Sequence, residues 1–115
     1  MANTFKVVTK AGVTSADVIY TVAGSTTTVV LGLILGNTTS SSINATVTLG
    51  TDTANRAGAN NETNQDVELI TSAAIPANSS LEFMGGNKII METTDTLSVT
   101  GSGAVDIALS IMEIT

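Results

Sequence analysis

The chain has 115 residues, of which 43% are hydrophobic and 12% charged, and its formal net charge is −6. Charged residues make up about 25% of an average soluble domain, so much of this surface must be threonine, serine, asparagine and glycine. The hydrophobic content excludes a disordered chain, and the length suits one domain, 1–115, with one core. The four lysines and arginines are scattered along the sequence, which argues against nucleic-acid binding.

Targeting signals and membrane segments are not expected. The residues after Met1 lack the apolar stretch of a signal peptide, and no apolar run approaches the about 20 residues that a membrane-spanning helix needs. There is no cysteine, so no disulfide can form. We therefore expect synthesis and folding in a cytoplasm, with no membrane partner.

The first half of the chain contains the longest apolar run. Residues 5–9 and 18–22 are short predicted strands, and residues 1–8 are considered as an N-terminal arm. Residues 29–35 carry no polar side chain, and they are rich in Val, Leu and Ile between Thr-rich and Gly-Asn borders. A buried helix is the alternative, but the β-branched residues and glycines favour a strand. We predict the central strand of a sheet here, covered on both faces.

Residues 43–49 show the clearest alternation in the sequence. Ile43, Ala45, Val47 and Leu49 alternate with polar residues, which predicts one core face and one face toward water or a partner. Residues 51–65 follow with no apolar side chain larger than alanine. A stretch of this length is longer than an ordinary hairpin connection, so it is predicted to be an exposed loop.

The second half repeats short strands between turn residues. Pro76 fixes a turn, and Gly85-Gly86-Asn87 is typical of a hairpin turn joining the strands on either side of it. Ile114 breaks the period-two pattern of the last strand, which indicates either a bulge or an end that enters an interface. The strands predicted in this half are residues 67–71, 81–84, 88–91, 97–100 and 105–111.

These elements predict a fold class. About eight short strands separated by Gly, Asn and Ser turns are typical of a single antiparallel β-sandwich or jelly-roll-like domain. Tyr20 and Phe83 lie in phase with apolar neighbours and are predicted to belong to its core.

Enzymatic chemistry has few residues available. The sequence contains no histidine, cysteine or tryptophan, which removes the commonest general base and the thiolate nucleophile. Glu82, Glu92 and Asp95 could in principle form a pair of catalytic carboxylates, but they are interpreted as solvated strand and turn residues. Oxygen-bearing side chains between Asp52 and Asp66 suggest a calcium loop, yet their spacing does not follow the EF-hand pattern. We expect no enzyme activity, cofactor or metal.

Five stretches in fixed order carry a resemblance to a known group of proteins. They are residues 20–33 (YTVAGSTTTVVLGL), 36–38 (GNT), 74–81 (AIPANSSL), 92–99 (ETTDTLSV) and 104–115 (AVDIALSIMEIT). In this order they resemble small bacteriophage virion structural proteins. The chain departs from the pattern at Ala23, where proline is usual, and at Asn78 and Thr94, where glycine is usual.

The resemblance implies a β-sandwich protein of a phage particle. We expect a capsid decoration (cement) protein that binds the major capsid protein as a homo-oligomer, with a trimer favoured. A neck, tail or fibre component, including a receptor-binding one, is the alternative, and a free bacterial domain with an enzymatic or sugar-binding role is a third reading. The residues expected to contact a partner lie in the arm, on the polar face of 43–49 and in the loop: Asn3, Phe5, Asn44, Thr46, Thr48, Asp52, Asn55, Arg56, Asn60 and Asn61.

Overall fold

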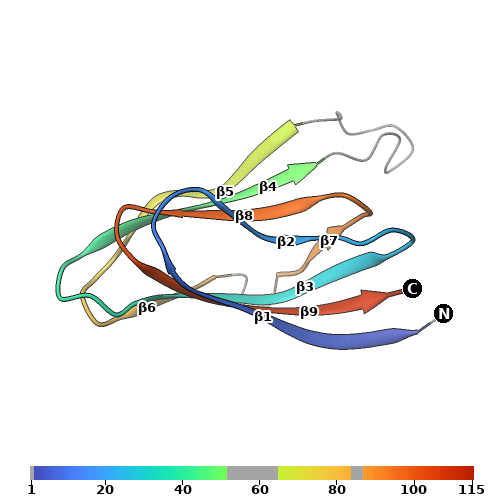
Figure 1. Cartoon of the computed structure of the whole chain (residues 1–115), viewed down its shortest axis with the longest axis horizontal. Helices are drawn as coiled ribbons and strands as arrows, with labels where there is room; N and C mark the ends of the chain where they lie inside the picture. The colour runs from blue at the N-terminus through green and yellow to red at the C-terminus, as the bar shows by residue number, and fades with distance from the viewer. Residues whose placement is uncertain (1, 52–64, 84–86) are drawn as a thin grey trace.

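The computed structural model describes residues 2–51, 65–83 and 87–115 of the chain. Within these ranges nine strands form two antiparallel sheets that pack face to face (Figure 1). The predicted β-sandwich is confirmed, with nine strands where about eight were expected. The strands are β1 (Asn3–Val13), β2 (Asp17–Thr21), β3 (Thr27–Asn37), β4 (Ile43–Thr51), β5 (Gln65–Ile75), β6 (Ser80–Phe83), β7 (Ile89–Met91), β8 (Thr96–Gly101) and β9 (Val105–Ile114).

The two sheets have different orders. Sheet A runs β1-β9-β3-β6, with β7 also paired to β3, and sheet B runs β2-β8-β4-β5. Strand β9 thus lies between β1 and β3, and Figure 1 shows the two ends of the chain side by side at one end of the molecule. Ala2 and Thr115 exchange two backbone hydrogen bonds there, of 3.1 and 2.9 Å.

Residues 3–8 belong to the sheet. They form the first half of β1, and each residue from Asn3 to Lys10 lies opposite a residue of β9 without a register shift. Because β9 would otherwise leave one edge of backbone groups unpaired, this segment is held by the ladder and is not a free arm.

Strand β3 is central, as predicted, but it is covered on one face only. It pairs with β9 along one edge and with β6 and β7 along the other. Val30, Leu33 and Leu35 are buried between the sheets, whereas 43% of Ile34 is exposed. A register shift between Val30 and Gly32 explains why the buried positions are not strictly alternating.

The predicted hairpin pairing of the strands on either side of Gly85-Gly86-Asn87 is wrong, and Gly85 and Gly86 themselves lie outside the described residues. Strand β6 pairs with residues 33–36 of β3, and β7 pairs with residues 28–30 of the same strand. Both pairings are antiparallel to β3, so β6 and β7 run in the same direction along one edge. They do not pair with each other, because the edge of β3 is long enough to provide a partner for each.

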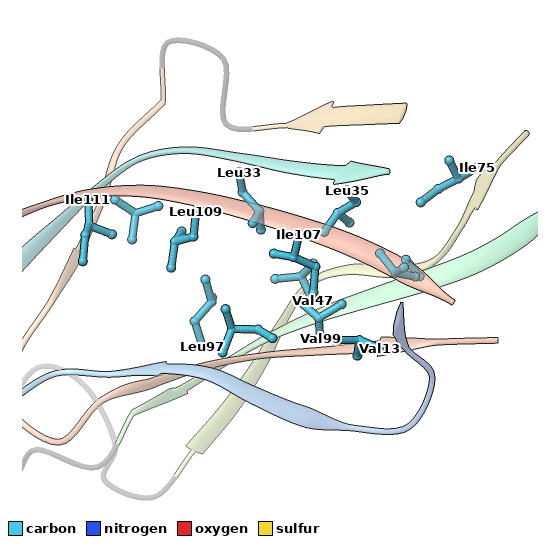
Figure 2. Packing of buried hydrophobic residues seen from close by; sticks show 14 of the residues in the cluster. Val13, Leu33, Leu35, Val47, Ile75, Leu97, Val99, Ile107, Leu109 and Ile111 are labelled. Carbon is cyan, nitrogen blue, oxygen red and sulfur yellow. The ribbon is translucent and has the colours of Figure 1, made fainter. Parts of the chain in front are cut away.

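The core lies between the two sheets. Figure 2 shows Leu33, Leu109 and Ile111 of sheet A pointing toward Leu97 and Val99 of sheet B. All five are at most 1% exposed. The predicted alternation of β4 is confirmed at Ile43, Ala45 and Val47, which are buried, while Leu49 is half-buried. Tyr20 packs against the core, and the side chain of Phe83 lies outside the described residues.

One buried amide closes the end of the sandwich opposite the chain termini. Asn37 is 2% exposed. Its Nδ2 donates hydrogen bonds to the carbonyl oxygens of Ser41, Ile75 and Pro76, at 2.8, 3.0 and 3.1 Å. Its Oδ1 accepts from the backbone N–H and the hydroxyl of Thr39, at 2.9 and 2.7 Å. The side chain therefore joins the loop after β3 to the end of β5.

We predict that Asn37→Ala lowers the free energy of unfolding by about 2–4 kcal/mol, because several buried polar groups lose their partners at once. Urea unfolding followed by circular dichroism measures this. The control is Asn44→Ala, an exposed asparagine on β4, which should change stability by no more than about 0.5 kcal/mol. Equal effects of the two substitutions would contradict the role given to Asn37.

The backbone is left-handed at two of the positions where this chain differs from the phage-protein pattern. Asn78 has φ of 57° and Thr94 has φ of 74°, both in the left-handed region that glycine adopts most easily. These are the positions where the pattern has glycine. Asparagine tolerates this conformation, whereas a β-branched threonine is strained in it.

Thr94→Gly should therefore stabilise the protein. Relief of the left-handed strain is worth about 1–2 kcal/mol, and the added freedom of the unfolded glycine offsets about 0.5–1 kcal/mol of it. Asn78→Gly should be nearly neutral and serves as the control. Thermal unfolding of both variants tests this, and a larger gain for Asn78→Gly would refute the explanation.

Candidate interaction surface

The outer face of sheet A carries a row of apolar side chains across four strands. Phe5 of β1 lies opposite Met112 of β9, Met112 opposite Val29 of β3, and Val29 opposite Ile90 of β7. Directly opposed residues of an antiparallel pair point to the same face. The adjacent row contains the buried Ile111, so the row with Phe5 points away from the core.

Side chains of this row and of the neighbouring outward-facing rows are exposed to solvent. Phe5 is 71% exposed, Val7 63%, Ile90 55% and Ile34 43%. They are four of the six large hydrophobic residues that are exposed in the described part of the chain. Exposed apolar patches of this kind are typical of surfaces that contact another molecule.

The end of β9 completes the surface. Its register with β1 is continuous from Ile107 to Ile114, so the break in the sequence period does not come from a bulge in β9. Instead, Met112 and Ile114 point outward and Glu113 points inward. We call the surface formed by Phe5, Val7, Val29, Ile34, Ile90, Met112 and Ile114 the apolar face.

The outer face of sheet B is polar. Thr46 lies opposite Thr100, and Thr48 lies opposite Ser98. Some of these groups are used within the sheet: the Thr46 hydroxyl accepts a hydrogen bond from the backbone N–H of Ser72 at 2.9 Å. This face can form hydrogen bonds with a partner, and it also carries Val18 of β2, which lies opposite Ser98 and is 49% exposed.

The predicted contact residues separate into three groups. Asn3 and Phe5 lie on β1 in sheet A, and Asn44, Thr46 and Thr48 lie on β4 in sheet B. The structure therefore does not bring these two groups together. The third group comes from the predicted loop 51–65 and lies outside the described residues: Asp52, Asn55, Arg56, Asn60 and Asn61. Most of the suggested calcium loop lies outside them as well.

The carboxylates considered for catalysis differ in their surroundings. Glu82 is exposed on β6, opposite Ile34. Asp95 is fully buried, and its carboxylate accepts a hydrogen bond from the backbone N–H of Glu92 at 3.0 Å. The expectation of a solvated carboxylate is thus wrong for Asp95. Its carboxylate can be buried because a backbone N–H of the same turn donates a hydrogen bond to it.

In residues 2–51, 65–83 and 87–115, no cluster of three or more potential metal ligands among histidine, cysteine and carboxylate side chains occurs. Nor do these residues contain a helix that could cross a membrane.

A polar cluster lies at the end of the sandwich where the chain termini meet. Lys6 Nζ lies 2.6 Å from one carboxylate oxygen of Glu113. The Tyr20 hydroxyl donates to the other oxygen at 2.5 Å and lies 2.7 Å from the hydroxyl of Thr28. Since Tyr20 belongs to sheet B and the other three residues to sheet A, this cluster connects the two sheets.

The environment shifts two pKa values in opposite directions. Burial, together with the hydrogen bond to Glu113, raises the pKa of Tyr20 to about 12. The hydrogen bonds from Lys6 and Tyr20 lower the pKa of Glu113. Both shifts favour a neutral tyrosine that donates to an ionised glutamate.

The titration of Tyr20 can be read directly, because it is the sole tyrosine and the chain has no tryptophan. We expect the phenolate absorbance of the folded protein after a rapid pH jump to have its midpoint near pH 12, against about 10 in urea. Glu113→Gln should move the folded midpoint toward 10, and equal midpoints in the folded and urea-unfolded protein would refute the contact.

The same shifts predict how stability depends on pH. A lowered pKa at Glu113 gives stability that is present at neutral pH and lost as the pH falls through the folded value, and Glu113→Gln should make that acid decline shallower. The raised pKa of Tyr20 gives stability that is lost between about pH 10 and 12. Tyr20→Phe should remove this alkaline contribution, as measured by urea unfolding at a series of pH values.

Comparison with known proteins gives little further guidance. No protein-family model matches the chain, and no curated protein matches it. The chain is similar to a solved structure described under the words "Bacillus endospore appendages form a novel family of disulfide-linked pili", with a TM-score of 0.43 and 13% identity. The match covers 96% of this chain and 85% of that one. At this level it establishes neither a shared fold nor a shared function.

Proposed function

We propose that this protein is a non-enzymatic structural protein of a bacteriophage particle, acting as a capsid decoration protein that binds the major capsid protein as a homo-oligomer. The observation that carries the proposal is the apolar face. It covers one side of a small domain with exposed hydrophobic side chains, which is what a protein needs to associate with another protein. The resemblance to phage structural proteins supports the particle as the setting.

The two outer faces of the sandwich suit such a role in different ways. The apolar face offers hydrophobic area for a close contact, and the threonine-rich face of sheet B offers uncharged hydrogen-bonding groups. Thr46 and Thr48 are uncharged, so a partner that covers them does not have to desolvate a charged group, and the desolvation penalty stays small. On a particle, many copies bind at once, so modest contacts at each copy act together.

A place in the neck, tail or fibre is the second candidate. The same apolar face would support assembly of such a structure, so the fold alone does not separate the two roles. They differ in the number of copies on a particle.

Copy number is therefore the test. Particles purified from the phage that encodes this protein would be analysed by quantitative mass spectrometry, with the major capsid protein as the internal standard. A copy number comparable to that of the major capsid protein, and in fixed ratio to it, supports decoration. A copy number that is a small fraction of the capsid protein's supports the neck, tail or fibre. Absence from particles would overturn the proposal.

A further inference from the structure

We propose that the apolar face is the contact between two copies of this chain, which pack sheet A against sheet A about a two-fold axis. The inference rests on the homo-oligomer of the proposed function and identifies the surface that forms it. It also replaces the expected trimer, because a single patch that contacts itself forms a dimer, whereas a ring of three needs two different patches.

The face has the layout of a protein interface. Its centre holds the apolar row from Phe5 to Ile90, and the next row contains Val7 and Ser110, which lie opposite each other. Polar residues occur toward its limits: Asn3 and Thr27 lie opposite Ile114 at one end, and Glu82 lies opposite Ile34 near the other. An apolar centre within a polar rim is the usual arrangement of an interface.

The size of the face suits a second copy. β1, β9 and β3 are 11, 10 and 11 residues long, and β6 and β7 add 4 and 3 residues. With about 4.8 Å between strands and a rise of about 3.3 Å per residue, the whole outer face of sheet A, polar rim included, covers about 600 Å². Two such faces bury about 1,200 Å², at the lower limit of stable protein interfaces. Two sheets can stack face to face at about 10 Å, as the two sheets of a sandwich do.

Charge argues for self-association through this side. With a net charge of −6, two copies repel each other, so the contact that joins them must be poor in acidic groups. No charged residue occurs in the row from Phe5 to Ile90 or in the row of Val7 and Ser110. Two identical faces can therefore meet without bringing like charges together or desolvating a charge at the centre.

The β1 edge of sheet A is protected against the addition of a further strand. Strand β1 is the edge strand, and Lys6 and Lys10 lie on the inward phase of its alternation, opposite the buried Ile111 and Ile107. Inward-pointing charged residues on an edge strand hinder the addition of a further strand. Association through the face is consequently favoured over continuation of the sheet at the β1 edge.

The first test compares two matched variants. Ser110→Glu places a charge in the middle of the apolar face, and Thr100→Glu places the same charge on the outer face of sheet B; both positions are exposed. Sedimentation equilibrium and light scattering of the full chain should give a dimer for the wild type and for Thr100→Glu, and at least a tenfold weaker dimer for Ser110→Glu. Similar unfolding midpoints for the two variants, extrapolated to low protein concentration, would show that both remain folded.

The second test measures geometry. Because the chain has no cysteine, Ser110→Cys and Thr100→Cys each provide a single site for a spin label. Across a face-to-face dimer, labels at position 110 are separated by about one sheet spacing plus their lateral offset, whereas labels at position 100 are separated by about three spacings, roughly 30 Å or more. Pulsed electron paramagnetic resonance should therefore give the shorter distance at position 110.

Several results would overturn the inference. They are a monomeric wild type at millimolar concentration, a trimer, a dimer that Ser110→Glu leaves intact, and a shorter label distance at position 100. If the protein is a monomer in solution and its apolar face becomes covered only when it binds the capsid protein, then the capsid protein is the partner of this face. None of these outcomes changes the copy number on particles, so the proposed function is tested separately.

Discussion

Strand β9 is hydrogen-bonded along both of its edges, to β1 on one side and to β3 on the other. Its ten residues alternate between the two faces of sheet A. Ile107, Leu109 and Ile111 enter the core, and the residues between them face outward. A slip of one residue would exchange the two sets, so the register of this strand determines both the core and the apolar face.

The same register has a consequence at the end of β9. With Met112 and Ile114 directed outward, Glu113 must point between the sheets, where a lone carboxylate would be unfavourable. Lys6 and Tyr20 contact its two oxygens, which keeps the carboxylate ionised and lowers the pKa of Glu113. Burial, together with the hydrogen bond to Glu113, raises the pKa of Tyr20. The cluster thereby allows apolar side chains to occupy the outer surface at this end without leaving a buried charge unpaired.

Local patterns in the sequence predict strands well, because the period of two is a property of neighbouring residues. This is why the alternation of β4 and β9 and the central position of β3 could be recognised. The choice of pairing partner depends on residues far apart in sequence, so Gly85-Gly86-Asn87 resembled a hairpin turn although β6 and β7 both pair with β3.

The candidate surface was only partly predictable for a related reason. Hydrophobic residues such as Phe5 and Val7 are the same in sequence whether they face the core or the solvent, and only the register with β9 shows that they face outward. The break in period at Ile114 was the one available signal. The burial of Asp95 was not visible either, because its stabilising donor is a backbone amide of its own turn.

The position of β9 between β1 and β3 also affects how the domain folds. The first strand of sheet A can pair only after the ninth has been synthesised, so on the ribosome β1 and one edge of β3 remain unpaired until β9 is made. Domains dominated by such distant pairings fold on the millisecond to second timescale, more slowly than domains built from local contacts. During this interval the apolar residues of β1 are open to contact with other chains, and unpaired strand edges with exposed apolar side chains promote aggregation.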